Sequence, residues 1–183
     1  METVSLEIDG KTVEAAEGAT ILEAAESVGI QIPHMCHLKQ LKPYGACRLC
    51  MVEIVNGTKK KLVASCVHPV KEGLVVVTNS EKVMKIRRML IELTWPISQD
   101  LGKEFGVSRS RFRTETSDCH LCGICVRYCA EVKKLNIAYF KGRGIDKEIA
   151  IVPGLGKECN YCHECFGFCK GGKIIHEMGR AYE

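Results

Sequence analysis

The sequence predicts an α+β protein made of two small cysteine-bearing modules joined by a helical linker. Three observations support this class. Two turn signals, Asp9-Gly10 and Asn56-Gly57, each separate two runs of strand-forming residues. Apolar residues recur at helical spacing through residues 80–95. One cysteine spacing then occurs twice, without change, in the last third of the chain.

Residues 1–78 are expected to form a mixed sheet with one helix. Strands are predicted over 4–8 and 11–15, over 51–55 and 59–64, and over 74–78. Between the hairpins, Thr20 and Glu23 form a capping-box pair at the start of a short helix, and Gly29 ends it. Hairpin, helix, loop, hairpin and strand in this order are typical of a ferredoxin-type β-grasp fold.

The remaining chain is predicted to hold a linker over 79–113 and a second module over 114–183. In the linker we expect one helix over 80–95, ended by Pro96.

The second module should contain a hairpin with strands over 135–140 and 148–152. Ile174 and Ile175 suit a short closing strand.

Cysteine is the one residue type with an unusual count, 12 in 183 residues. No apolar run reaches the roughly 20 residues of a membrane-spanning helix, and the first ten residues lack the basic and apolar pattern of a secretion signal. We therefore expect a cytoplasmic protein without membrane insertion. In a reducing compartment such thiols are more often metal ligands than disulfides. A net charge of +4 favours no nucleic-acid surface.

Two cysteine runs share the spacing C-x2-C-x2-C-x3-C, 40 residues apart. They consist of Cys119, Cys122, Cys125 and Cys129, and of Cys159, Cys162, Cys165 and Cys169. In ferredoxins with two such runs, the last cysteine of each run binds the other [4Fe-4S] cluster. This arrangement assigns Cys119, Cys122, Cys125 and Cys169 to one cluster, and Cys129, Cys159, Cys162 and Cys165 to the second.

Zinc and disulfides are the plainer alternatives for these thiols. Structural zinc uses paired C-x2-C knuckles, whereas each repeated run offers three close thiolates, which no knuckle pair requires. Disulfides are disfavoured in a reducing compartment. The alternatives carry more weight for the remaining cysteines, whose spacing, C-x10-C-x2-C-x15-C, is less specific.

The remaining cysteines lie in segments with a family resemblance. These are Ile32-Pro33-His34-Met35-Cys36, Gly45-Ala46-Cys47-Arg48-Leu49-Cys50-Met51-Val52-Glu53 and Ala64-Ser65-Cys66. They resemble the [2Fe-2S] domain at the start of the large iron–sulfur subunit of respiratory complex I, and of related subunits of NAD-linked hydrogenases and formate dehydrogenases. The resemblance implies that Cys36, Cys47, Cys50 and Cys66 hold one [2Fe-2S] cluster.

Residues 119–132 resemble the two-[4Fe-4S] segment of the same hydrogenase-type subunits. The family often has a further His-plus-three-Cys site between the two modules. No cysteine occurs over 67–118, so the sequence predicts three clusters only.

These patterns predict an electron-transfer subunit without catalysis of its own. The chain has no dinucleotide-binding G-x-G-x-x-G after a strand and no P-loop. By resemblance, its partners would be a flavin/NAD(H)-binding subunit and a hydrogenase or formate dehydrogenase catalytic subunit, with ferredoxin as a further candidate. Two rivals stay open: a freestanding polyferredoxin-like carrier and a zinc-binding interaction module.

Overall fold

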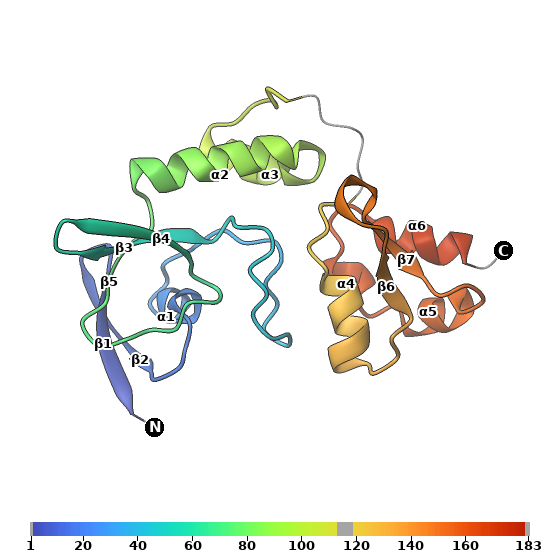
Figure 1. Ribbon diagram of the computed structural model, residues 1–183, viewed down its shortest axis with the longest axis horizontal. Helices are drawn as coiled ribbons and strands as arrows, with labels where there is room; N and C mark the ends of the chain where they lie inside the picture. The colour runs from blue at the N-terminus through green and yellow to red at the C-terminus, as the bar shows by residue number, and fades with distance from the viewer. Residues whose placement is uncertain (1, 113–118, 182–183) are drawn as a thin grey trace.

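The computed structural model describes residues 2–112 and 119–181. Figure 1 shows a sheet-bearing N-terminal part, a pair of helices beside it and a smaller C-terminal part. The module boundary expected after residue 113 lies outside the described residues.

The N-terminal part is a five-stranded mixed sheet with the order β2-β1-β5-β3-β4. Its strands are β1 (Thr3–Ile8), β2 (Lys11–Ala16), β3 (Met51–Asn56), β4 (Lys59–Ala64) and β5 (Val75–Val77). The two expected hairpins are confirmed: β1 pairs antiparallel with β2, and β3 with β4. Asp9 and Gly10 both have positive φ, as a two-residue turn between right-twisted strands requires. β5 is the central strand and joins the two hairpins, because it pairs parallel with β1 and antiparallel with β3.

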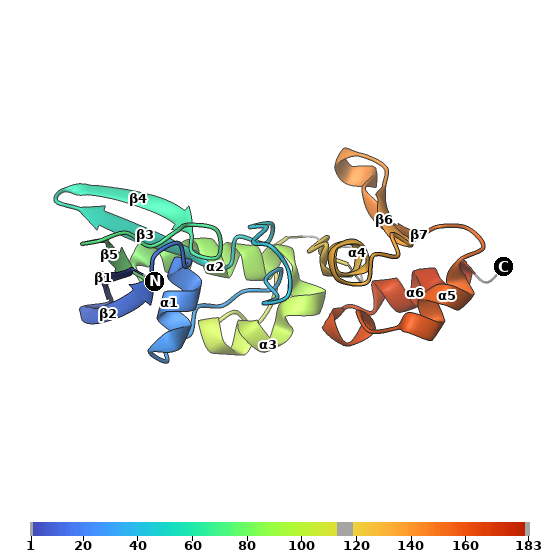
Figure 2. The ribbon, with the colours of Figure 1, turned by 90° about the horizontal axis from the view of Figure 1, so that it is seen from below.

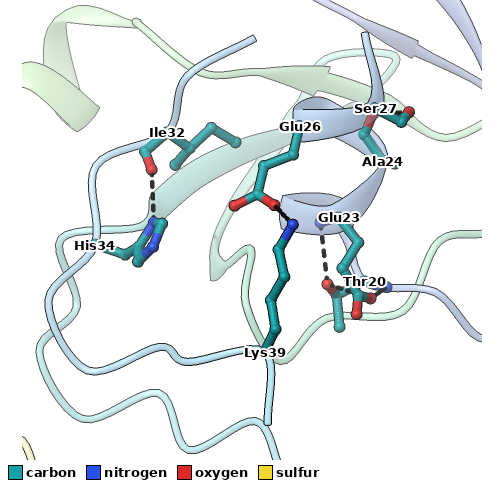
Figure 3. Close-up of polar contacts among 8 residues, drawn as sticks. All are labelled: Thr20, Glu23, Ala24, Glu26, Ser27, Ile32, His34 and Lys39. Carbon is teal, nitrogen blue, oxygen red and sulfur yellow. Dashed lines mark hydrogen bonds and ion pairs between the residues drawn. The ribbon is translucent and has the colours of Figure 1, made fainter. Parts of the chain in front are cut away.

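Helix α1 (Ile21–Ser27) covers one face of this sheet. The expected capping box is present, since Thr20 Oγ1 accepts from the Glu23 N–H at 3.2 Å and Glu23 Oε2 accepts from the Thr20 N–H at 2.7 Å (Figure 3). The buried side of the helix packs into a continuous apolar core with the strands. This core holds the short helix in place, because an isolated seven-residue helix is not stable in water.

The linker holds two helices, α2 (Glu81–Leu93) and α3 (Trp95–Phe105). The helix expected over 80–95 is confirmed as α2, which ends before Pro96. The second helix was not expected, and Pro96 lies in its first turn. Proline fits there since the first helical N–H groups have no intrahelical acceptor. Ile91 and Phe105 from these helices pack with Met35 and Leu49 of the N-terminal part, so the helices rest on the cysteine-bearing loops.

The C-terminal part surrounds a second apolar core. Its elements are α4 (Ile124–Arg127), a π-helical turn (Tyr128–Val132), β6 (Ala138–Lys141), β7 (Glu148–Ile151), α5 (Gly156–Cys162) and α6 (Lys173–Arg180). The expected hairpin is confirmed as β6 paired with β7, which projects away from α5 and α6 in Figure 2. Among the described residues, no helix is long and apolar enough to cross a membrane.

The closing strand expected at Ile174 and Ile175 is wrong, because both residues lie in α6. Gly172 begins this helix with a left-handed φ of 75°. Ile174 is completely buried while Ile175 is exposed, and Lys173 pairs with Glu177 at 3.1 Å one turn later. Two adjacent isoleucines carry no period of their own, so they did not distinguish a strand from a helix.

Replacing Thr20 with alanine tests how much the capping box stabilises the N-terminal part. The Glu23 N–H at the start of α1 loses its acceptor, and Glu23 Oε2 loses the hydroxyl that helps to hold it in place. The free energy of unfolding should therefore fall by about 1 kcal/mol. Urea unfolding of the full chain measures the change. Thr20→Ser keeps the hydroxyl and should stay close to the wild type; an equal loss in both variants would contradict the capping explanation.

Candidate metal centres

Four cysteine sulfurs of the N-terminal part lie close together beneath the linker helices. Cys36, Cys50 and Cys66 are at most 1% exposed, and Cys47 is half-buried. The Sγ atoms of Cys50 and Cys66 are 3.3 Å apart. The charges of Cys36 and Cys47 add to the forces that raise the pKa of Cys66, so all four groups lie within mutual electrostatic reach.

Backbone N–H groups point at these sulfurs. The Met35 N–H donates to Cys47 Sγ at 3.4 Å, and the Cys47 N–H donates to Cys36 Sγ at 3.3 Å. A hydrogen bond from the Cys36 thiol holds the pKa of Cys47 below its usual value, and the Met35 and Leu49 N–H groups act in the same direction. The pKa of Cys50 is lowered by the Cys66 thiol in the same way. The same two hydrogen bonds raise the pKa of Cys36 and of Cys66, so one sulfur of each pair is favoured as a thiolate, the form that binds metal, while its partner keeps its proton.

This donor set fits a [2Fe-2S] cluster. Four buried or half-buried cysteine sulfurs could serve as its ligands once deprotonated, and N–H groups aimed at sulfur stabilise added negative charge. The positive φ of Gly45, 68°, and of Arg48, 59°, turns the backbone sharply around Cys47.

A first C-terminal cavity is lined by cysteines from both repeated runs. They are Cys119, Cys122, Cys125 and Cys169. The apolar side chains of Ile124, Ile149 and Ile174 also line it. Burial raises the pKa of Cys122 to about 11, so its thiolate needs a compensating cation such as iron.

A second cavity is lined by the complementary cysteines. They are Cys129, Cys159, Cys162 and Cys165. Ile137 and Ala138 line it as well, and the Ile137 N–H donates to Cys129 Sγ at 3.2 Å. Burial raises the pKa of Cys159 to about 11 and of Cys165 to about 12. Each cavity thus gathers three cysteines of one run and the last cysteine of the other, a donor set that fits a [4Fe-4S] cluster.

The two runs turn the chain at the same position. The residue after the second cysteine is left-handed in both, with φ of 74° at Gly123 and 36° at His163. A Cβ at Gly123 would lie 3.1 Å from Phe140 and 3.6 Å from Tyr44, whereas His163 is exposed. Sterics as well as φ therefore favour glycine at this position of the first run.

The first C-terminal cavity is within electrostatic reach of both other cysteine groups. Burial is the main cause of the raised pKa of Cys122 and of Cys125. Cys47 of the N-terminal group adds to the first shift, and Cys165 of the second cavity adds to the second. Among the described residues, no three His, Cys, Asp or Glu side chains are placed to hold a single metal ion.

A docking loop, residues 38–44, joins the N-terminal group to the C-terminal part. Leu41 is 5% exposed and belongs to the C-terminal core. The Lys42 N–H donates to Glu131 at 3.3 Å, and Arg127 donates to the Lys42 carbonyl. The Arg127 guanidinium lies 4.8 Å from the ring centroid of Tyr44. These contacts hold the first two cysteine groups next to each other.

Sequence reasoning missed the docking loop and the buried Arg87 on α2. The loop's one signal was the ten-residue gap between Cys36 and Cys47, longer than the C-x4-C of plant-type ferredoxins. Arg87 gave only a weak signal, since it lies four residues after Val83 on the apolar side of the helix.

Comparisons with known proteins agree with the donor chemistry of the first group. Residues 1–81 match the 2Fe-2S iron-sulfur cluster binding domain family. The chain is 34% identical to the NADPH-Fe(3+) oxidoreductase subunit alpha of Geobacter sulfurreducens, over 94% of this chain and 24% of that protein. It is also 34% identical to the NADH-ubiquinone oxidoreductase 75 kDa subunit of Reclinomonas americana, over 80% of this chain and 26% of that protein.

The chain thus spans about a quarter of the length of these curated relatives. For one solved structure, the match covers a larger share of the other chain than it does for these relatives. It is a chain in the crystal structure of an NAD+-reducing [NiFe]-hydrogenase in the H2-reduced state. The TM-score is 0.72 at 28% identity, and the match covers 82% of this chain and 75% of that chain.

A matched pair of substitutions tests the turn after the second cysteine of each run. Gly123→Ala should lower the free energy of unfolding by about 1–3 kcal/mol, because a left-handed φ and the contact with Phe140 both oppose a Cβ. His163→Gly removes left-handed strain at an exposed site and should cause no loss. Urea unfolding of both variants measures the difference, and equal losses in the two variants would contradict the steric explanation at Gly123.

Proposed function

We propose that this protein relays single electrons through three clusters. Its N-terminal part belongs to the 2Fe-2S iron-sulfur cluster binding domain family. The chain is also related to subunits of NAD(P)H-linked oxidoreductases. It would connect a flavin/NAD(H)-binding subunit with a catalytic hydrogenase or formate dehydrogenase subunit. Ferredoxin is a further candidate partner, and the cysteine content favours a cytoplasmic location.

The observation that carries the proposal is the grouping of all twelve cysteines into three sets of four. A [2Fe-2S] cluster would be held by Cys36, Cys47, Cys50 and Cys66, one [4Fe-4S] cluster by Cys119, Cys122, Cys125 and Cys169, and another by Cys129, Cys159, Cys162 and Cys165. The corresponding modules would be 1–78 and 114–183, with 79–113 as the linker.

When bound, an iron–sulfur cluster accepts and releases one electron at a time. The chain's own residues supply the surroundings that this requires. Thiolates hold iron, and the N–H groups of Met35, Cys47 and Ile137 donate to sulfur. Apolar side chains such as Ile124 and Ile137 exclude water from the C-terminal cavities. The docking loop keeps the first two sites adjacent, so that an electron has a short path between them.

The two rival functions make different demands on composition and assembly. A freestanding polyferredoxin-like carrier would purify as a stable monomer, whereas a subunit should co-purify with larger chains. A zinc-binding interaction module would hold zinc and no sulfide. The NAD+-reducing hydrogenase chain that this fold resembles favours the subunit.

Iron and acid-labile sulfide content is the first test of the proposed function. Anaerobically purified protein should hold about ten of each per chain, two from one [2Fe-2S] and eight from two [4Fe-4S] clusters. EPR of the reduced protein should resolve both cluster types. Well-folded protein that is colourless, or that contains zinc in place of iron and sulfide, would refute the relay.

Paired cysteine substitutions test which run holds which cluster. If Cys122 and Cys169 serve the same cluster, Cys122→Ala, Cys169→Ala and the double variant should each lose about four irons. Cys159→Ala combined with Cys169→Ala should lose about eight, because those residues line different cavities. A loss of about eight irons when Cys122→Ala is combined with Cys169→Ala, and of about four when Cys159→Ala is combined with Cys169→Ala, would show that each run holds its own cluster.

A further inference from the structure

Arg87 is the most deeply buried cationic side chain near the N-terminal cysteines. It projects from α2 toward the cysteine-bearing loop and is 3% exposed. Its Nε donates to the Leu49 carbonyl at 3.1 Å and its Nη2 to the Met51 carbonyl at 3.0 Å. The two acceptors belong to the residues on either side of Cys50, so one guanidinium grips the backbone before and after this cysteine.

This buried charge has no carboxylate in direct contact. No ion pair joins Arg87 to an Asp or Glu among residues 2–112 and 119–181, although Asp9 and Glu104 act on it at longer range along with Cys50. Arginine stays protonated in proteins, so the positive charge is permanent. A buried cation that meets only carbonyl oxygens and an aromatic ring, here Phe105 at 5.9 Å, is costly unless a further negative charge lies nearby.

The N-terminal cysteine group supplies such a charge. Four thiolates on a cluster core of about +2 leave about −2 at the site, and one-electron reduction makes this about −3. The Leu49 N–H acts on Cys47, while the Leu49 carbonyl accepts from Arg87. Arg87 is thereby linked to the site through the backbone as well as through space.

We propose that Arg87 is the charge-compensating and positioning residue of the N-terminal site, raising the reduction potential of its [2Fe-2S] cluster. This inference rests on the proposed function. A positive charge fixed in a poorly solvated region stabilises the additional negative charge of the reduced cluster. The two carbonyl contacts also fix the backbone around Cys50.

Arg88 offers a matched control one residue along the same helix. It carries the same charge, is exposed, and donates through Nε to the Phe105 carbonyl at 3.1 Å. Water and salt screen an exposed charge, so removing it should have little effect on the buried site.

The test is a redox titration of the holoprotein followed by EPR, with the two [4Fe-4S] signals as internal references. Arg87→Gln should lower the equilibrium constant for reduction of the [2Fe-2S] cluster at least tenfold, which is about 59 mV for a one-electron couple. Arg87→Lys, which keeps the charge, should restore most of the wild-type potential. Arg88→Gln should leave all three potentials unchanged.

A [2Fe-2S] potential in Arg87→Gln equal to that in Arg88→Gln would overturn the proposal, and so would an equal shift in Arg87→Lys and Arg87→Gln. Arg87→Met, whose side chain has no buried polar group of its own to satisfy, replaces Arg87→Gln if the latter fails to retain iron. The melting temperature of each variant separates a loss of packing from a change of potential. A wild type without a [2Fe-2S] signal would refute the proposed function itself, whereas wild-type potentials in loaded variants would refute only the role of Arg87.

Discussion

Gathering four cysteine sulfurs at one buried point is the constraint on which the whole structure depends. Burial and repulsion between neighbouring thiolates oppose ionisation, as the raised pKa values of Cys122 and Cys165 show. The fold opposes these costs with N–H groups directed at sulfur, and we propose that iron supplies the remaining compensation. Regular structure is short where the sulfurs meet, because loops and single helical turns can aim successive side chains at one point.

The same constraint explains how the parts of the molecule are joined. The linker helices pack on Met35 and Leu49, next to the first cysteine group, and the docking loop enters the C-terminal core through Leu41. Lys39 on this loop also pairs with Glu26 of α1 at 3.3 Å (Figure 3). The segment between Cys36 and Cys47 therefore has contacts on both sides, and it couples the position of one cysteine group to that of the next.

Local signals predicted the parts of the fold that depend on neighbours in the sequence. Thr20 with Glu23 marked the start of α1, and the two-residue turn at Asp9-Gly10 set a hairpin, because the interactions involved span only a few residues. The same reasoning missed α3, because Pro96 can end one helix or begin another, and it failed at Ile174, whose burial depends on distant partners. Arg87 was missed for a related reason, since nothing local distinguishes a buried arginine from a solvated one.

By itself, the sequence determined the chemistry: twelve thiols in three sets, with spacings that bring three sulfurs of each repeated run to one place. The exchange of the fourth sulfur between the two runs was also predicted from the ferredoxin pattern, and the cavity linings agree with it. Only the tertiary structure decided how the docking loop joins the first set to the C-terminal part and which cation lies beside the first set. The physical reason is the sequence separation between the residues that interact. Spacing fixes contacts within one or two turns of chain, whereas Cys169, Leu41 and Arg87 reach their sites through the packing of residues far apart in the sequence.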